Sequence, residues 1–130
     1  MASIFTKIIN REIPAHIVAE NDQFLAFLDI SPLQKGHVLV IPKFEEDYIF
    51  DLEDELLSQM MLFAKSVAKK IKNAFPAANR IGVAVIGLEV PHAHIHLIPI
   101  NKMNDMNFAN AKLSLNEEEL KEIAAKIASN

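Results

Sequence analysis

The chain has 130 residues, of which 51% are hydrophobic and 23% are charged, and its formal net charge at pH 7 is -4. These values predict a folded domain rather than a disordered chain, and the acidic balance argues against a large nucleic-acid surface, which would need clustered lysine and arginine. The sequence has no cysteine, which excludes disulfides, thiol nucleophiles and cysteine-bound zinc. With no apolar run near the roughly 18–20 residues of a membrane span and no signal-peptide pattern, we expect a cytoplasmic protein without a membrane partner.

The first part of the chain predicts a short helix followed by three strands. Apolar residues four apart favour a helix within residues 3–10. Residues 16–20 and 24–29 are predicted strands, and the turn-forming residues 21–23 join them. The apolar and largely β-branched stretch 37–41 predicts a buried strand.

The clearest helix is predicted from about Leu52 to Phe75. Its apolar residues recur every three or four positions, acidic residues occupy its first turn, and lysines lie near its end, as the helix dipole favours. Asp51 is the predicted N-cap, and Pro76 is expected to end the helix.

Two further strands and a final helix are predicted after the long helix. The strands cover residues 81–86 and 91–100, and the helix covers residues 117–130 after a polar linker at 101–116. We expect one domain over residues 1–130 with a core at 3–100. Because strands and helices are grouped rather than alternating, the fold class is α+β with a mainly antiparallel sheet.

Three of the five histidines alternate with apolar residues in the segment PHAHIHLIPI, at positions 92, 94 and 96. On a strand this spacing puts all three rings on one face. The row could be a solvated strand face, part of a metal site, or a nucleophilic row acting at a phosphorus centre, where imidazole is a good nucleophile.

Strand geometry disfavours one metal ion shared by all three rings. Alternate residues are roughly 6.6 Å apart, so the outer rings would be about 13 Å apart, whereas zinc holds each nitrogen at about 2 Å. A metal would need a third ligand from elsewhere, for which Asp29, Glu89 and His37 are candidates. We therefore expect no metal and no cofactor.

Three ordered blocks of sequence carry a family resemblance. His92-Ala-His94-Ile-His96-Leu-Ile resembles the signature of the histidine-triad family of nucleotide hydrolases and transferases. Residues 26–32 and 36–43 are similar to the family's nucleoside-binding strand pair. Residues 4–9 with 13–15 are similar to the N-terminus of the family's nucleoside-phosphoramidase-like branch. The resemblance implies a five-stranded antiparallel sheet with one long helix, and a homodimer.

The resemblance also implies roles for individual side chains. His94 would be the nucleophile that forms a covalent nucleotidyl-histidine intermediate, with His96 near the phosphoryl oxygens or leaving group. His92 would support the strand, and His37 would be a buried hydrogen-bonding partner. Asp29 would accept from the ribose hydroxyls, or would instead cap the turn before Ser31. The apolar residues that would enclose the base, or equally belong to the core, are Phe5, Ile8, Phe27, Leu28 and Ile30.

This sequence departs from the family pattern at several positions. Thr6 and the pair Phe44-Glu45 stand where some members have zinc ligands. Ala84 stands where many relatives have an amide that touches the nucleotide. Glu89, near the usual phosphate-binding hydroxyl, would repel a phosphate unless it were protonated, paired or turned away. The expected function is hydrolysis of a nucleoside phosphoramidate or related anhydride or ester, releasing an AMP-like purine nucleotide. The alternatives are a nucleotide-binding or signalling module with little turnover, or a His-x-His metal enzyme.

Overall fold

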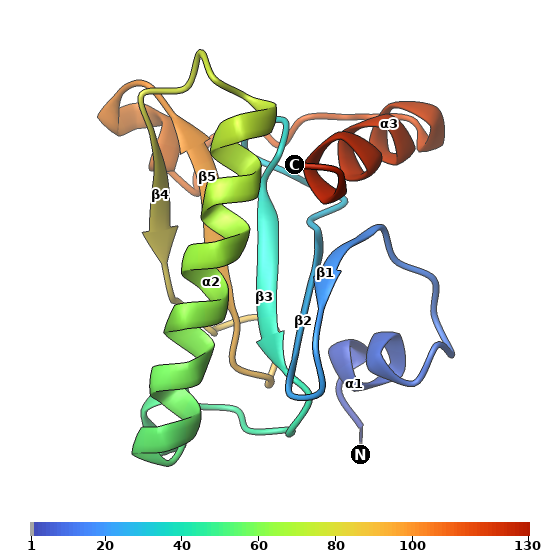
Figure 1. Cartoon of the computed structure of the whole chain (residues 1–130), viewed down its shortest axis with the longest axis vertical. Helices are drawn as coiled ribbons and strands as arrows, with labels where there is room; N and C mark the ends of the chain where they lie inside the picture. Colours follow the sequence, from blue (N-terminus) through green and yellow to red (C-terminus); the bar gives the residue numbers. More distant parts are fainter. Residues whose placement is uncertain (1) are drawn as a thin grey trace.

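The computed structural model describes residues 2–130 and contains one five-stranded sheet flanked by helices (Figure 1). Met1, part of the predicted 1–130 domain, lies outside the described residues. None of the helices in the described chain is long and apolar enough to span a membrane. The elements in chain order are α1 (Ile4–Ile9), β1 (Ile17–Glu20), β2 (Phe24–Leu28), β3 (Val38–Pro42), η1 (Ile49–Asp51), α2 (Asp54–Ala74), β4 (Arg80–Ala84), β5 (Ile95–Ile100), η2 (Met103–Met106) and α3 (Glu117–Ala128).

The sheet has the strand order β1-β2-β3-β5-β4, and every neighbouring pair is antiparallel. The predicted α+β class with a five-stranded antiparallel sheet is therefore confirmed. The central β3–β5 pair sets Leu39 opposite His96. Consequently the strand that follows His37 lies directly beside the strand that carries the end of the histidine motif.

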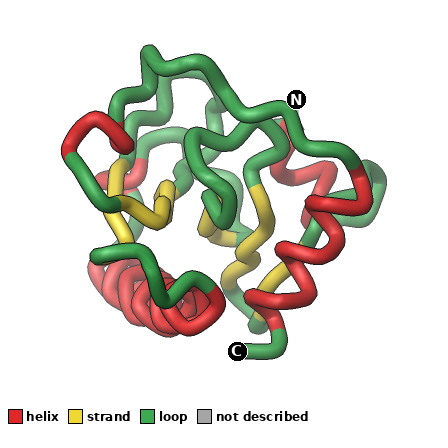
Figure 2. Tube along the Cα trace, turned by 90° about the horizontal axis from the view of Figure 1, so that it is seen from above, coloured by secondary structure: helices red, strands yellow, loops and turns green. Residues whose placement is uncertain are grey.

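The two faces of the sheet are covered differently (Figures 1 and 2). Helices α2 and α3 pack on one face, where Met60, Val67 and Ile71 of α2 are fully buried in the larger hydrophobic cluster. Helix α1 packs on the other face, in a smaller cluster built around Phe5 and Phe27. The α2 face is the main core, and the α1 face is left partly open.

The long helix begins two residues later than predicted. Residues Ile49–Asp51 form a 3-10 turn, and α2 then begins at Asp54 with Glu53 as its N-cap. The predicted cap at Asp51 was wrong, because that residue belongs to the preceding turn. No side chain of residues 2–130 caps α2, but Asp54 and Glu55 in its first turn still complement the helix dipole.

The histidine motif is only partly a strand, contrary to the prediction for residues 91–100. Strand β5 begins at Ile95, because the preceding backbone pairs with loops: His92 N–H donates to Val90 O and Ala93 N–H donates to Glu46 O. Likewise β4 ends at Ala84 instead of residue 86. The bend before Ile95 breaks the straight strand that the alternation of rings predicted.

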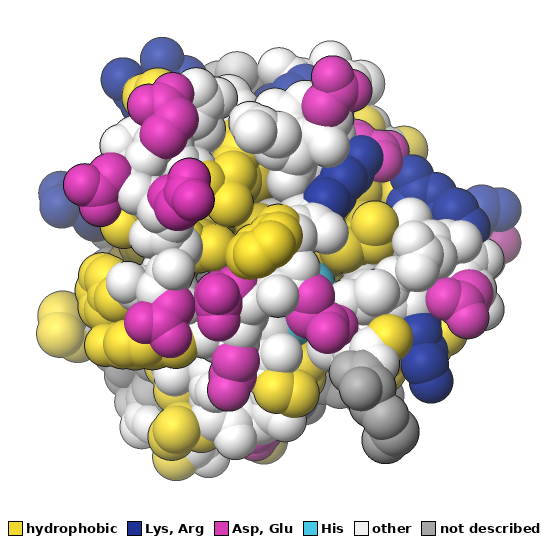
Figure 3. Space-filling view, turned by 90° about the horizontal axis from the view of Figure 1, so that it is seen from below, with side chains coloured by type: hydrophobic (Ala, Val, Ile, Leu, Met, Phe, Trp, Pro, Cys, Tyr) yellow, Lys and Arg dark blue, Asp and Glu magenta, His cyan; other side chains and the backbone are white. Residues whose placement is uncertain are grey.

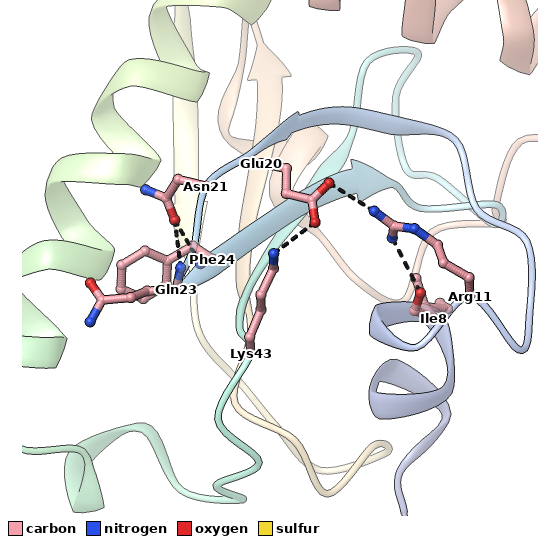
Figure 4. Close-up of polar contacts among 7 residues, drawn as sticks. All are labelled: Ile8, Arg11, Glu20, Asn21, Gln23, Phe24 and Lys43. Atoms are coloured by element: carbon pink, nitrogen blue, oxygen red, sulfur yellow. Dashed lines mark hydrogen bonds and ion pairs between the residues drawn. The ribbon is translucent and has the colours of Figure 1, made fainter.

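The far end of α1 is tied to the sheet by Glu20 (Figure 4). The two oxygens of Glu20 accept from Arg11 Nη2 and Lys43 Nζ, both at 2.7 Å. Arg11 has a φ of 62°, in the left-handed region, and its Nη1 donates to Ile8 O at 3.4 Å. The hydrogen bond from Lys43 is the main reason that the pKa of Glu20 is lowered. These contacts hold α1 against the sheet, where it forms one wall of the site.

Candidate active site

A cavity of about 460 Å³ opens on the α1 face of the sheet. Two of the three motif histidines, His94 and His96, line it. Figure 3 shows the molecule from below, where a small histidine surface lies among apolar and acidic side chains. The other predicted site residues on its wall are Phe5, Ile8, Phe27, Leu28, Asp29, Ile30 and Glu89. The two remaining predictions, His92 and His37, lie behind this wall.

His94 lines the cavity, and one of its ring nitrogens, Nε2, has no hydrogen-bond partner among the described residues. Its Nδ1 lies 2.7 Å from the carbonyl oxygen of His92, which can only accept, so Nδ1 carries the proton. In the neutral ring, Nε2 then keeps the lone pair. This side chain is only 7% exposed, so the lone pair lies in a largely desolvated site.

His96 presents a proton rather than a lone pair. Leu33 N–H donates to His37 Nδ1 at 3.1 Å, so the proton of His37 is on Nε2. That Nε2 lies 2.9 Å from His96 Nδ1 and donates to it. The remaining proton of His96 is therefore on its Nε2, where it can donate to a ligand in the cavity.

Burial keeps the hydrogen-bonded rings of His37 and His96 neutral. Desolvation, with smaller contributions from His96 and Lys112, lowers the pKa of His37 to about 3. Desolvation and neighbouring His94 lower the pKa of His96 to about 4. Both rings are thus neutral hydrogen-bonding groups at physiological pH.

His92 has both nitrogens engaged and is fully buried. Its Nε2 faces Pro42 O at 2.8 Å and its Nδ1 faces Ser3 Oγ at 2.8 Å. Desolvation lowers the pKa of this ring. The three rings of the motif therefore differ: His94 offers a lone pair, His96 offers a proton, and His92 offers neither.

Asp29 has two partners at the cavity wall. Oδ1 accepts from Ser31 N–H at 2.8 Å, so the turn-capping interpretation describes a contact that is present. Oδ2 lies 3.7 Å from His37 Nε2 and is the oxygen without a hydrogen bond among the described residues. Desolvation raises the pKa of this carboxyl. Asp29 can therefore cap the turn through Oδ1 and accept from a ligand through Oδ2 at the same time.

Asp29, His37 and His96 each have a possible ligand atom within 4.8 Å of the others. The sequence named Asp29 and His37 as candidate metal partners, and the fold brings them together. However, the donor direction derived above puts a proton on His37 Nε2, the atom that would have to bind the ion. The cluster is better described as a hydrogen-bonded relay than as a metal site.

Two wall residues, Phe108 and Lys112, were missed because they lie in the segment expected to be a linker. Phe108 packs edge-on against His96, with ring centroids 4.9 Å apart. Lys112 is the one lysine or arginine on the described cavity wall, and its Nζ donates to Phe108 O and Asn110 O. Leu113 N–H donates to Pro32 O at 2.8 Å, which holds the segment in place. No periodic pattern marks these residues in the sequence.

Four aromatic rings form a continuous row along the cavity. Successive centroids lie 5.1 Å apart for Phe5 and His94, 5.0 Å for His94 and His96, and 4.9 Å for His96 and Phe108. All three contacts are edge-to-face. The pair of histidines is thus enclosed between one phenylalanine from each end of the chain.

The fifth histidine, His16, lies outside the cavity and is half-buried, with its Nε2 3.2 Å from a Glu117 oxygen. Glu89 lines the cavity but is exposed, so water can solvate its carboxylate.

Comparisons with known proteins agree with this geometry. The family model for the HIT domain matches residues 10–103. An uncharacterized HIT-like protein of Borreliella burgdorferi is 38% identical over 98% of this chain and 96% of its own. An adenosine 5'-monophosphoramidase of Schizosaccharomyces pombe is 34% identical over 99% of this chain and 98% of its own.

A solved structure extends the match to three dimensions. The crystal structure of a HIT-like protein involved in cell-cycle regulation from Bartonella henselae superposes with a TM-score of 0.84. It is 35% identical, and the match covers 98% of this chain and 94% of that one. This chain belongs to the histidine-triad (HIT) family.

Proposed function

We propose that this protein hydrolyses nucleoside phosphoramidates, or related anhydrides and esters, and releases a nucleoside monophosphate. The observation that carries the proposal is the unequal pair in the cavity. His94 has a free Nε2 lone pair, and the neighbouring His96 has an Nε2–H directed to the same space. A nucleophile beside a neutral donor is what attack on a phosphorus centre requires. The phosphoramidase name of the fission-yeast relative supports the same substrate class.

The reaction follows from these atoms in two displacements. His94 Nε2 attacks phosphorus, which forms a P–N bond to the ring and breaks the bond to the leaving amine. The amine departs with a proton taken from water. The His92 carbonyl stabilises the ring through Nδ1–H as positive charge develops, and His96 Nε2–H donates to a phosphoryl oxygen. The hydroxide left from that water then displaces His94 from phosphorus, which restores the lone pair on Nε2 and leaves the oxygen and proton of the hydroxide on the released nucleotide.

The nucleoside end of the substrate is assigned to the apolar part of the cavity. Phe5, Ile8 and Phe27 form a buried wall there, and Ile30 is 68% exposed at the rim, where it can cover a base. Asp29 Oδ2 is available to accept from ribose hydroxyls. This arrangement fits a purine nucleotide such as AMP.

Lys112 offers a positive charge in a cavity where two of the family's usual nucleotide contacts are replaced, by Ala84 and Glu89. Ala84 brings no donor, and Glu89 brings a negative charge to the cavity. Lys112 is the one lysine or arginine among the described wall residues, and two backbone carbonyls hold its ammonium in place. Its third N–H can meet an anionic phosphoryl group. We propose that Lys112 offsets the charge of Glu89 during nucleotide binding.

The catalytic proposal is tested with purified protein and adenosine 5'-phosphoramidate, by following AMP release. His94→Ala should lower kcat by about a thousandfold while keeping AMP affinity within a few-fold, because only the attacking atom is lost. The matched control is His16→Ala, a histidine outside the cavity. If wild type and His94→Ala release AMP at the same rate, the hydrolase assignment is wrong. If wild type binds AMP but releases none from the substrate, the alternative of a nucleotide-binding module takes its place.

We also propose a homodimer that joins two sheets. Strand β4 is an edge of the sheet and pairs only with β5 among the described residues. Val83 on β4 and Met61 and Leu62 on α2 are exposed large hydrophobic side chains. An exposed edge with apolar neighbours favours association. Light scattering should give twice the 14.5 kDa chain mass, and a monomer at micromolar concentration would contradict it.

A further inference from the structure

Ser3 is unusual because it is buried without being apolar. Among the described residues, the buried polar side chains are Ser3 and the four histidines of the site. Ser3 Oγ lies 2.8 Å from Nδ1 of His92, 89 residues away in the sequence. A buried hydroxyl is costly unless it is hydrogen-bonded, so this contact needs an explanation.

Two neighbours complete a small network with Ser3. Glu45, just after β3, accepts from Ser3 N–H at 2.7 Å and from the Thr6 hydroxyl. Ser3 Oγ also accepts from Thr6 N–H at 3.1 Å, as the N-cap of α1. We call Ser3, Thr6 and Glu45 the N-terminal latch.

The direction of each hydrogen bond in the latch can be assigned. The proton of His92 is on Nε2, because that atom faces the carbonyl of Pro42. Nδ1 of His92 therefore needs a donor. The Thr6 hydroxyl donates to Glu45, so its oxygen, 3.4 Å from His92 Nδ1, does not supply that proton. The Ser3 Oγ atom lies 2.8 Å from His92 Nδ1 and 3.3 Å from Thr6 Oγ1, and the shorter contact assigns the Ser3 hydroxyl proton to His92 Nδ1.

The latch acts on His94 through the backbone of His92. With both ring nitrogens of His92 engaged, its carbonyl is held 2.7 Å from His94 Nδ1. That contact keeps the His94 proton on Nδ1 and the lone pair on Nε2. Phe5, on the same short helix as Thr6, packs against the His92 and His94 rings at 5.8 and 5.1 Å and limits their rotation.

We propose that Ser3 and Glu45 are positioning residues, which orient His92 and thereby hold His94 in the Nδ1–H tautomer that leaves Nε2 free to attack. Neither side chain lines the cavity, so neither is assigned a contact with substrate. The kinetic part of this inference rests on the proposed function, whereas its tautomer part does not.

Nitrogen NMR of histidine-labelled protein at neutral pH tests the tautomers directly. In the wild type we expect His94 as the Nδ1–H form, and His92 and His96 as Nε2–H forms. Ser3→Ala removes the donor to His92 and should give His92 and His94 mixed tautomers. Ser3→Thr keeps both the hydroxyl and the helix cap and should restore the wild-type spectrum. Ser58→Ala, an exposed serine on α2, is the matched control.

Kinetics on the same proteins separate positioning from general support. Ser3→Ala should lower kcat about tenfold with KM within twofold, and Ser3→Thr should recover most of the loss. Glu45→Ala should act in the same direction more weakly, while Glu45→Gln, which keeps an acceptor oxygen, should stay near wild type.

Several outcomes overturn the inference. If His94 of the wild type is in the Nε2–H form, the inference is wrong, and this result needs no variant and holds even if Ser3→Ala fails to fold. The inference is also wrong if Ser3→Ala leaves the tautomers unchanged, whether or not kcat falls. If the wild type releases no AMP, the proposed function fails, and the latch is then judged by the NMR spectra alone.

Discussion

The histidine pair lies between two flanks that are built in different ways. On one flank, Phe5 of α1 is 6% exposed and belongs to a buried cluster backed by the N-terminal latch. On the other flank, Phe108 is half-buried in a polar, largely irregular segment that ends in the Leu113 to Pro32 hydrogen bond. The two rings make similar contacts with the histidines, yet only the first is part of a core. The first flank is therefore suited to hold the nucleophile, and the second to meet variable substrate groups.

The largest expected effect compares the two phenylalanines. Phe5→Ala should lower the free energy of unfolding by about 3–5 kcal/mol, because it leaves a cavity among Phe27, His92 and His94. Phe108→Ala should cost about 1–2 kcal/mol, since part of this ring stays in water. Urea unfolding with a common m-value measures both. Equal losses would mean that the flanks do not differ as described.

The second expected effect concerns acid stability at the Phe108 flank. The pKa of His37 is lowered to about 3 and that of His96 to about 4, whereas an unfolded histidine titrates near 6.5. Below pH 6.5 the unfolded chain binds more protons than the folded chain does. The free energy of unfolding that these neutral rings contribute above pH 6.5 is therefore lost as the pH falls toward their folded pKa values. Each such histidine contributes up to about 1.4 kcal/mol per pH unit within that window. Asp29, whose pKa is raised by burial, partly offsets the loss at the acid end.

Unfolding midpoints in urea between pH 7.5 and 4.5 measure this dependence. His37→Gln keeps an amide that can hydrogen-bond to His96 but cannot titrate, so it should reduce the slope by about one proton. A slope that is the same in wild type and variant would show that the buried His37 ring does not stay neutral on acidification.

The smallest expected effect concerns ligand charge at Lys112. Lys112→Met keeps the length of the side chain and removes the cation, so AMP should bind about tenfold more weakly while adenosine affinity is unchanged. Calorimetry at low and high salt should show the difference shrink with ionic strength. Lys121→Met on the exposed side of α3 is the control. Equal weakening of AMP and adenosine would place Lys112 at the nucleoside instead of the phosphate.

Local patterns predicted most of the secondary structure, and the family resemblance predicted one side of the site. Period-two and helical spacings identified the strands and α2, with errors at ends where turns compete with regular structure, as at Ile49–Asp51. The resemblance named His94, His96 and Asp29, and these side chains do meet in one cavity. Phe108 and Lys112 escaped notice because their placement depends on a contact between Leu113 and Pro32, which are distant in the sequence.

The amino-acid sequence by itself determined the α+β class, the antiparallel strands and the row of three histidines, because alternation and helical spacing are properties of neighbouring residues. Only the tertiary structure made the three rings unequal. The protons of His92 and His96 are placed by partners far away in the chain: Ser3 and Pro42 for His92, and the Leu33–His37 pair for His96. The proton of His94 is placed by the nearby carbonyl of His92, which those contacts hold in position. A tautomer depends on which acceptor or donor faces each nitrogen, and folding alone brings those groups together.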